Sequence, residues 1–282
     1  MPNITCDEAA TLINEAASLG CRSPWEVELA KLALENRIAT YLQGGGATRT
    51  FVLVHGAWHG GWCWRRVSER LLAAGHRVFS PTLTGLADRA HLLTPEVNLM
   101  THVQDVVGLI QSEELEDVVL CGHSYGGMVI TGVAEALRRR MDALVYLDAF
   151  VPEPHQSLVD AMPEDRREKA RLAFGSSWRI PSPSAASWKI TSPEDQAWVD
   201  RRTSDQPAAC MLQALEHDRP WAHVRKAVYI RAAGYDPSPF GAIEAKLANT
   251  PGWHMERVAC GHEVMVQEPE WLCQRLLAAG LR

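Results

Sequence analysis

The sequence predicts an α/β fold with a mostly parallel central sheet, helices on both faces of that sheet and an inserted cap. Two observations lead to this fold class. From Thr50 onward, short apolar runs alternate with longer amphipathic segments, which is typical of consecutive βαβ units. The stretch 150–222, rich in Pro, Ser and charged residues, interrupts this alternation before it resumes.

The expected elements follow from the two periodicities. Short runs rich in branched apolar residues predict strands at 50–55, 77–80, 117–121, 143–147, 227–232 and 255–259. Segments with a helical apolar stripe predict helices at 64–74, 102–112, 128–140, 240–248 and 269–279. Because right-handed crossovers make such strands parallel, we expect ligands at their carboxyl ends.

The chain is expected to divide into three parts. Residues 1–46 carry two capping boxes and two apolar stripes, and are predicted to be a helical extension that ends in a glycine linker. Residues 47–149 and 223–282 form the predicted core, and 150–222 form the predicted cap. The stripes of the extension are expected to dock on the cap or on a second subunit, so a homodimer is one expected assembly.

Composition limits the possible partners. The 282 residues are 46% apolar, which suits one large domain with an insertion, and the net charge of −6 argues against a nucleic-acid partner. No apolar stretch is long enough to span a membrane, and the beginning of the chain does not have the pattern of a signal peptide. The seven cysteines lack C-x-x-C spacing. We therefore expect no metal, no other cofactor and a reducing cytoplasm.

Ser124 lies at the centre of a nucleophile motif. The segment Gly122-His-Ser-Tyr-Gly126 has the pattern G-x-S-x-G, follows the apolar run 118–120 and precedes a predicted helix. The two glycines allow neighbouring segments to approach a strained turn, which projects the serine hydroxyl outward. The motif therefore predicts covalent acyl chemistry on Ser124.

A histidine must accept the proton of the serine hydroxyl and return it to the leaving group. His262 follows the last predicted strand and completes the chain order serine, acid, histidine. His254 precedes that strand and therefore lies at the wrong end of the sheet, and His123 is expected to pack beneath the turn. His262 is the predicted base among eleven histidines.

Two aspartates are candidates for the acid that orients the imidazole. Asp236 lies in the loop after 227–233, the usual place for this acid, although an aspartate before a proline also starts turns. Asp148 ends the run 144–148, one strand earlier. Its alternative role is to cap the first residues of the inserted segment 150–222 by hydrogen bonds. The residues alone leave both open.

The anion of a tetrahedral intermediate requires N–H donors. The expected donors are the backbone N–H groups of Tyr125, after the nucleophile, and of Ala57, in the glycine-rich loop after the first core strand. Apolar and thiol side chains near these loops, and a cap tryptophan, are candidates for the substrate pocket, with packing as the alternative for each. These candidates are Trp58, Cys63, Cys260 and Trp178.

Three segments together resemble bacterial esterases related to plant methylesterases and hydroxynitrile lyases. They are His-Gly-Ala-Trp-His-Gly-Gly-Trp at 55–62, Pro-Thr-Leu-Thr-Gly at 81–85, and Gly-His-Ser-Tyr-Gly-Gly at 122–127. The resemblance runs from about Phe51 to Arg282. It implies the α/β-hydrolase fold, and it implies hydrolysis of small aromatic esters or of methyl carbamates such as carbendazim. The family's serine, histidine and oxyanion positions match Ser124, His262, Tyr125 and Ala57.

The sequence departs from the family pattern at two places. Plant relatives carry the acid six residues after a strand tyrosine, whereas Asp236 stands seven residues after Tyr229 in a shorter loop, which favours Asp148. The lyases carry lysine after the catalytic histidine and threonine in the oxyanion loop, where this chain has Glu263 and Ala57.

The expected function is that of a serine hydrolase acting on a small-molecule ester. The predicted substrate is a carboxylic or carbamic ester with a methyl or aryl group, cleaved through an acyl-enzyme on Ser124. A hydroxynitrile lyase is one alternative, but it would lack the lysine and threonine of that activity. A non-catalytic receptor for a small ligand is another, against which the complete set of serine, histidine and aspartate argues.

Overall fold

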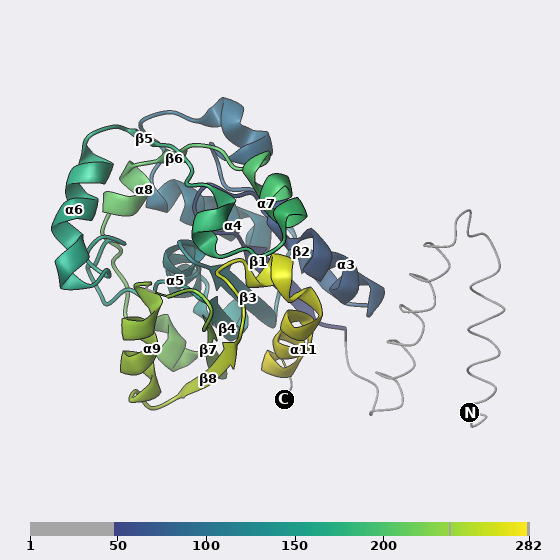
Figure 1. Cartoon of the computed structure of the whole chain (residues 1–282). Helices are drawn as coiled ribbons and strands as arrows, with labels where there is room; N and C mark the ends of the chain where they lie inside the picture. Colours follow the sequence, from purple (N-terminus) through teal and green to yellow (C-terminus); the bar gives the residue numbers. More distant parts are fainter. Residues whose placement is uncertain (1–47, 237, 281–282) are drawn as a thin grey trace, which may run out of the picture.

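The computed structural model describes residues 48–236 and 238–280, and a sheet of six strands forms its centre (Figure 1). The strand order is β2-β1-β3-β4-β7-β8, and every neighbouring pair is parallel. The strands are β1 Thr50–Val54, β2 Arg77–Phe79, β3 Val118–His123, β4 Met141–Leu147, β7 Lys226–Ala232 and β8 Trp253–Val258. The predicted parallel sheet is therefore confirmed.

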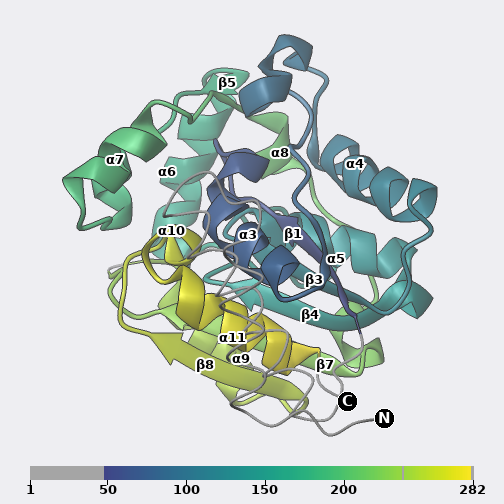
Figure 2. The same cartoon turned by 90° about the vertical axis from the view of Figure 1, so that its right-hand side faces the viewer.

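Helices cover both faces of this sheet, as predicted (Figure 1, Figure 2). Along β1, Phe51 and Leu53 pack with one group of helices, whereas Val52 and Val54 pack with the other, because alternate strand residues point to opposite faces. The first group is α3 Arg65–Ala73, α10 Val264–Gln267 and α11 Pro269–Ala279. The second group is α4 Leu99–Ser112, α5 Gly126–Ala136 and α9 Phe240–Ala248.

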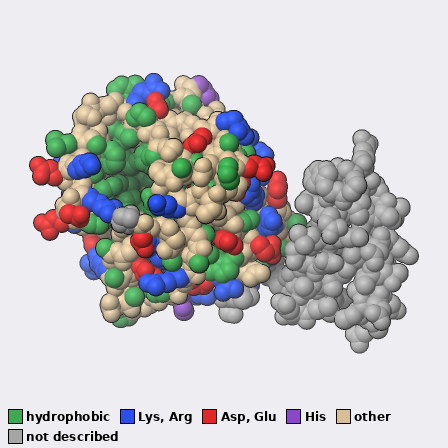
Figure 3. Space-filling model, in the orientation of Figure 1, with side chains coloured by type: hydrophobic (Ala, Val, Ile, Leu, Met, Phe, Trp, Pro, Cys, Tyr) green, Lys and Arg blue, Asp and Glu red, His purple; other side chains and the backbone are tan. Residues whose placement is uncertain are grey.

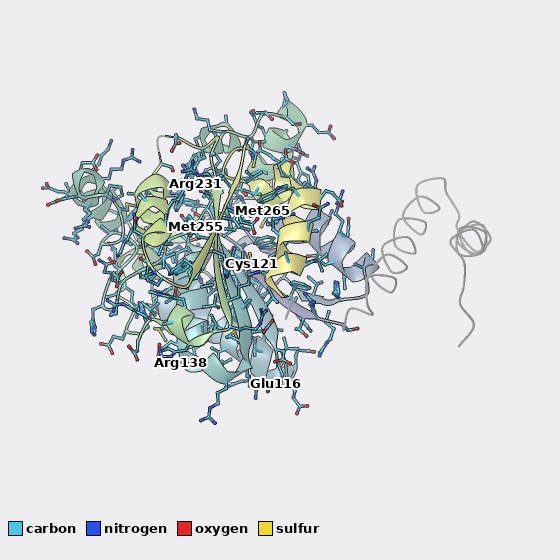
Figure 4. All side chains as sticks on the ribbon, turned by 90° about the horizontal axis from the view of Figure 1, so that it is seen from below. Glu116, Cys121, Arg138, Arg231, Met255 and Met265 are labelled. Carbon is cyan, nitrogen blue, oxygen red and sulfur yellow. The ribbon has the colours of Figure 1, made fainter. Side chains whose placement is uncertain are left out.

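The middle strands are buried on both faces. Cys121 on β3 is fully buried, and the view from below shows it in the middle of the molecule (Figure 4). Such strands consist of continuous apolar runs rather than alternating ones, which explains why their positions were predictable from the sequence.

Several helix and strand ends differ from the predictions. Helix α4 begins at Leu99, not at residue 102, because Asn98 caps it: its side chain accepts the N–H of Thr101, and the Thr101 hydroxyl accepts the N–H of Asn98. The helix expected to continue to residue 140 ends at Ala136, and a separate 3₁₀ turn, η3 Arg138–Arg140, follows it. These ends depend on local caps, which the apolar periodicity does not record.

The interrupting segment 150–222 forms short elements outside the main sheet. Figure 1 shows α6, α7, α8, β5 and β6 above it. Their bounds are α6 Glu164–Gly175, β5 Arg179–Ile180, η4 Ala185–Trp188, α7 Pro193–Asp200, β6 Gln206–Pro207, α8 Ala209–Leu212 and η5 Pro220–His223. The remaining 3₁₀ helices are η1 Gly61–Trp64 and η2 Ala87–Leu92. The division of the chain into core and cap stays a prediction.

Two further sequence predictions concern the ends of the chain and membranes. The helices, linker and docking stripes expected within residues 1–46 lie outside the described residues. Among the helices that the structure describes, none combines the length and apolar character that crossing a bilayer requires.

Candidate active site

Ser124 follows the end of β3 in a left-handed backbone conformation, with a φ of 54°. Its neighbours show why the motif needs glycine on both sides. A Cβ atom on Gly122 would lie 2.5 Å from the carbonyl oxygen of Gly126, and one on Gly126 would lie 2.7 Å from that of Val54. The turn therefore closes only with glycine at both positions, and it holds Ser124 at the carboxyl end of the sheet.

Asp148 and His262 follow the ends of β4 and β8, two strands that lie on either side of β7. Asp148 follows β4, also with a positive φ of 42°, and is fully buried. The Nδ1 atom of His262 donates to Oδ2 of Asp148 at 2.6 Å. The other carboxylate oxygen, Oδ1, accepts the backbone N–H of Ala232 at 3.1 Å and Nη1 of Arg231 at 2.8 Å. With both oxygens occupied, the carboxylate has one orientation and directs His262 Nε2 away from itself.

Asp236, the alternative acid, has a different partner. Its Oδ1 accepts Nη2 of Arg231 at 2.6 Å, and its side chain is 65% exposed. Of the two candidate acids, Asp148, which the family pattern favours, contacts His262, whereas Asp236 lies at the surface.

Arg231 links the two aspartates and was not singled out from the sequence. It is the next-to-last residue of β7, only 2% exposed, and its guanidinium also donates to the carbonyl oxygen of Tyr235 and to Oγ of Ser238, both at 2.9 Å. A cation against Asp148 stabilises the charged carboxylate in a buried place. The sequence signal was an arginine within the otherwise apolar run 227–232, since such a residue is buried only when it is paired.

Aromatic rings surround the imidazole of His262. Tyr235 and Phe240 stack on it with ring centroids 4.6 and 5.1 Å away, and the ring of His123 lies at 4.4 Å. The backbone N–H of His262 donates to the carbonyl oxygen of Trp188, at 2.9 Å. These ring contacts fix the plane of the imidazole.

His123 packs beneath the elbow and stays neutral. Its Nε2 donates to the carbonyl oxygen of His262 at 3.1 Å. Burial lowers its pKa well below the usual value, and the neighbouring His262 and His59 lower it further. No side-chain hydrogen bond of Ser124 is present among the described residues; the bond from a catalytic serine to its base often tightens only when substrate binds.

The loop after β1 has the features of an oxyanion loop. His55 accepts the N–H of Leu83 at Nε2, 3.1 Å away, so its Nδ1 carries the hydrogen and donates to the carbonyl oxygen of Gly56 at 2.8 Å. Burial lowers the pKa of His55 to about 3, which keeps it neutral. The bond to Gly56 polarises the same peptide whose N–H belongs to Ala57, the expected donor.

Tyr125, the other expected donor, is held by its side chain. Its hydroxyl donates to Nδ1 of His102 at 2.9 Å, because Nε2 of His102 donates to the carbonyl oxygen of Thr84 at 2.8 Å. Tyr125 also precedes α5, so its N–H lies at a helix N-terminus, where backbone donors favour a negative charge.

A comparison with protein families assigns the fold. A model of the Alpha/beta hydrolase family matches residues 51–275. The chain belongs to this family. The resemblance inferred from the sequence and the α/β-hydrolase fold that it implied are thus confirmed.

This hydrolase has relatives among characterised esterases. It is 43% identical over 239 residues to the carbendazim hydrolyzing esterase of Nocardioides sp. (strain SG-4G), covering 82% of this chain and 99% of that protein. Methylesterase 1 of Arabidopsis thaliana is 36% identical over 109 residues, which is 38% of this chain and 41% of the plant protein. The first alignment therefore spans a whole relative, and the second only a part.

Solved structures share the fold at lower identity. An extracellular alpha/beta-hydrolase from a Paenibacillus species has a TM-score of 0.73 and 22% identity, covering 83% of this chain and all of that one. Polyneuridine aldehyde esterase has a TM-score of 0.66 and 22% identity, covering 82% of this chain and 98% of that one. At this identity the likeness concerns the fold alone.

The expected pocket residues of this hydrolase lie in different places. Trp58, with a φ of 66°, is tied to the segment 150–222: its backbone N–H donates to Oε1 of Gln206 and its ring Nε1 to the carbonyl oxygen of Ile180, both at 3.0 Å. Trp178 is 42% exposed and stacks under Arg179, and none of its described contacts joins it to Ser124 or His262.

The two cysteines expected in the pocket differ in burial. Cys63 is 1% exposed and packs among the apolar residues that face α3 and α11, whereas Cys260 is half-buried beside His262. Burial raises the pKa of both thiols, that of Cys260 to about 12. Their contact with substrate stays a prediction.

Alkylation of the cysteines provides a test. Since the thiolate is the reactive form and the pKa of Cys260 is about 12, labelling by iodoacetamide should be slow at pH 7 and should rise about tenfold per pH unit up to pH 10. Cys63 should stay unlabelled in the folded enzyme. Protection of Cys260 by a competitive inhibitor would support a place in the pocket; fast labelling at pH 7 would contradict the protonated state.

A hollow lined largely by apolar side chains lies between the segment 150–222 and α9. Its volume is about 460 Å³, and Ser124, Asp148 and His262 are not among its lining residues. Its apolar wall includes Val151, Met162, Trp221, Ile243 and Trp253. The charged groups at this hollow include Glu153, which is paired with both Arg219 and Lys246. Separately, hydrophobic side chains gather in a hollow on the upper left of the face shown in Figure 3.

Proposed function

We propose that this enzyme hydrolyses small carboxylic or carbamic esters through an acyl-enzyme on Ser124. The observation that carries the proposal is the 2.6 Å contact between His262 Nδ1 and Asp148 Oδ2, beside a serine with a strained, left-handed backbone. This arrangement supplies a nucleophile, a base and an oriented acid at one edge of the sheet.

In the proposed mechanism the hydroxyl of Ser124 attacks the ester carbonyl while Nε2 of His262 takes its proton. Asp148 stabilises the imidazolium, and the buried Arg231 donates to Asp148 and holds its orientation. The N–H groups of Ala57 and Tyr125 stabilise the oxyanion. His262 then returns the proton to the leaving alcohol, and a water molecule releases the acyl group by the same steps in reverse.

The proposal includes carbamic esters because of the relative that aligns with this chain over almost its whole length. That relative is named for carbendazim hydrolysis and is 43% identical over 99% of its length. With a methyl carbamate, attack by Ser124 would release methanol and leave a carbamoyl group on the serine. Water would then release a carbamic acid, which loses carbon dioxide to give the amine.

A substrate panel tests this function. Purified enzyme should hydrolyse p-nitrophenyl acetate and a methyl N-arylcarbamate, with release of p-nitrophenol and of the arylamine. One equivalent of a p-nitrophenyl phosphonate should inactivate it, and mass spectrometry should find the phosphonyl group on Ser124. Binding of these esters without turnover or labelling would instead indicate a receptor, and cyanide release from a cyanohydrin would indicate a lyase.

Two further parts of the proposal concern the setting of the enzyme. We propose a cytoplasmic location, which the free cysteines among the described residues support: Cys63, Cys121, Cys210, Cys260 and Cys273. We also propose a homodimer, on the strength of the apolar stripes in the sequence of residues 1–46. Light scattering after size-exclusion chromatography measures the molar mass and therefore tests the homodimer directly.

A further inference from the structure

Beside the proposed triad lies a buried group of atoms that accept hydrogen bonds but have no donor among the described residues. They are Nε2 of His59, Nδ1 of His123, and both carboxylate oxygens of Glu263. Their side chains are almost completely inaccessible, with 2% exposure for His59 and 0% for Glu263. Buried polar atoms without partners are unfavourable, so this group requires a physical explanation.

The hydrogen bonds of His59 define which nitrogen carries its hydrogen. Nδ1 of His59 lies 2.8 Å from the carbonyl oxygen of Ala57, which can only accept, so Nδ1 is the donor. Nε2 of His59 then lies 3.5 Å from Oε2 of Glu263. If both groups were unprotonated, a lone pair would face a buried carboxylate with no donor between them, a strongly unfavourable arrangement.

We propose that His59 and Glu263 share one proton and form a positioning pair that holds the oxyanion loop against the loop of the catalytic histidine. The pair is neutral as a whole, whichever partner carries the proton. Glu263 directly follows His262, and Nδ1 of His59 donates a hydrogen bond to the carbonyl oxygen of Ala57. This role rests on the proposed serine mechanism, in which the N–H of Ala57 stabilises the oxyanion.

The oxyanion loop needs such support because its conformation is strained. Trp58 has a φ of 66°, which a tryptophan adopts only when its surroundings enforce it. Gln206 holds the N–H of Trp58 from the segment 150–222, and His55 holds the carbonyl of Gly56. His59 binds the carbonyl oxygen of Ala57 and also faces Glu263, so it links the oxyanion loop to the loop that carries His262. Movement of Ala57 would misplace its N–H relative to the developing oxyanion.

Two substitutions at Glu263 test the pair. Glu263→Met keeps the side-chain volume but removes the proton-sharing partner, so we expect kcat to fall about 10- to 100-fold with KM changed less than about threefold. Glu263→Gln can donate its amide N–H to Nε2 of His59, so its kcat should stay within about threefold of wild type. Glu270→Gln is the matched control, because Glu270 is 65% exposed and paired only with Arg70 among the described residues, and it should leave kcat unchanged.

Further variants separate positioning from mere stability. His59→Phe keeps a ring but removes both nitrogens, and should lose as much kcat as Glu263→Met; the double variant should lose little more, because the two act as one unit. If Glu263→Met is insoluble, His59→Phe carries the same test. The affinity of a trifluoromethyl ketone, which mimics the tetrahedral intermediate, should fall in proportion to kcat/KM. Because the pair is neutral, the acid limb of the kcat/KM profile in Glu263→Gln should match wild type.

Three results would overturn the proposal of a positioning pair. The first is full kcat in soluble Glu263→Met, and the second is a loss of kcat in Glu263→Gln as large as in Glu263→Met. The third is an acid limb of the kcat/KM profile that is displaced by a pH unit or more in Glu263→Gln. The last would mean that Glu263 acts on His262 as an isolated charge. Phosphonate labelling of Ser124 in the wild-type enzyme separates this outcome from failure of the mechanism. A labelled serine with an unimpaired Glu263→Met variant rejects the pair alone, whereas an unlabelled wild-type serine rejects the mechanism on which it rests.

Discussion

Replacing Ser124 with alanine is expected to lower ester turnover by about 10⁵-fold while the fold stays intact. The loss is this large because no other side chain can form the acyl-enzyme at the elbow. Alanine tolerates the left-handed backbone of this position no worse than serine, and the substitution removes only an oxygen atom. Stopped-flow or long-time assays with p-nitrophenyl acetate measure turnover, and thermal unfolding checks the fold.

His262→Ala provides the companion test. It should lose about as much turnover as Ser124→Ala, and the double variant should lose little more, because nucleophile and base work as one unit. The residual rate in each comes from the oxyanion donors and from binding. A His262→Ala variant with more than about one-tenth of wild-type kcat would contradict the mechanism.

The sheet was predictable because its strands are buried on both faces. A run such as 117–121 contains consecutive apolar residues, and β3 lies between β1 and β4 with helices on either side. The ends of elements were less predictable. The cap of α4 depends on two side-chain bonds between Asn98 and Thr101, and an apolar pattern contains no information about such local bonds.

Within the site, the residues marked by a local pattern were predictable from that pattern, whereas preferring Asp148 over Asp236 required a comparison with the family pattern. Ser124 stands in a five-residue motif, and His262 has a distinctive place after the last strand. The choice between the two aspartates depends on the contact of His262 Nδ1 with Asp148, a residue 114 positions earlier in the chain. Arg231 pairs with both carboxylates and therefore does not distinguish them.

The same limit applies to the buried pair. His59 and Glu263 belong to segments near opposite ends of the described chain, and the parallel sheet brings their loops together at its carboxyl edge. In the sequence, Glu263 differs from the family pattern only by replacing the lysine of the lyases. Its partner, His59, is identified by the 3.5 Å distance between Nε2 of His59 and Oε2 of Glu263.

Asp148→Asn is expected to lower kcat/KM about 10³- to 10⁴-fold, whereas Asp236→Asn should lower it less than about threefold. Asp236 is 65% exposed, and without its charge Arg231 still binds Asp148, the carbonyl of Tyr235 and Oγ of Ser238. Rates with p-nitrophenyl acetate across the pH range measure both effects. Equal losses in the two variants would contradict the assignment of the acid.

The large loss at Asp148 follows from the partners of its two oxygens. Oδ1 accepts from both Arg231 and the N–H of Ala232, so in an asparagine variant the amide oxygen must occupy that place and the NH₂ group must face His262. Nδ1 of His262 would then have to accept, which moves the ring hydrogen to Nε2. An imidazole protonated at Nε2 cannot take the proton of Ser124, so the variant keeps all three side chains in place and still lacks a base.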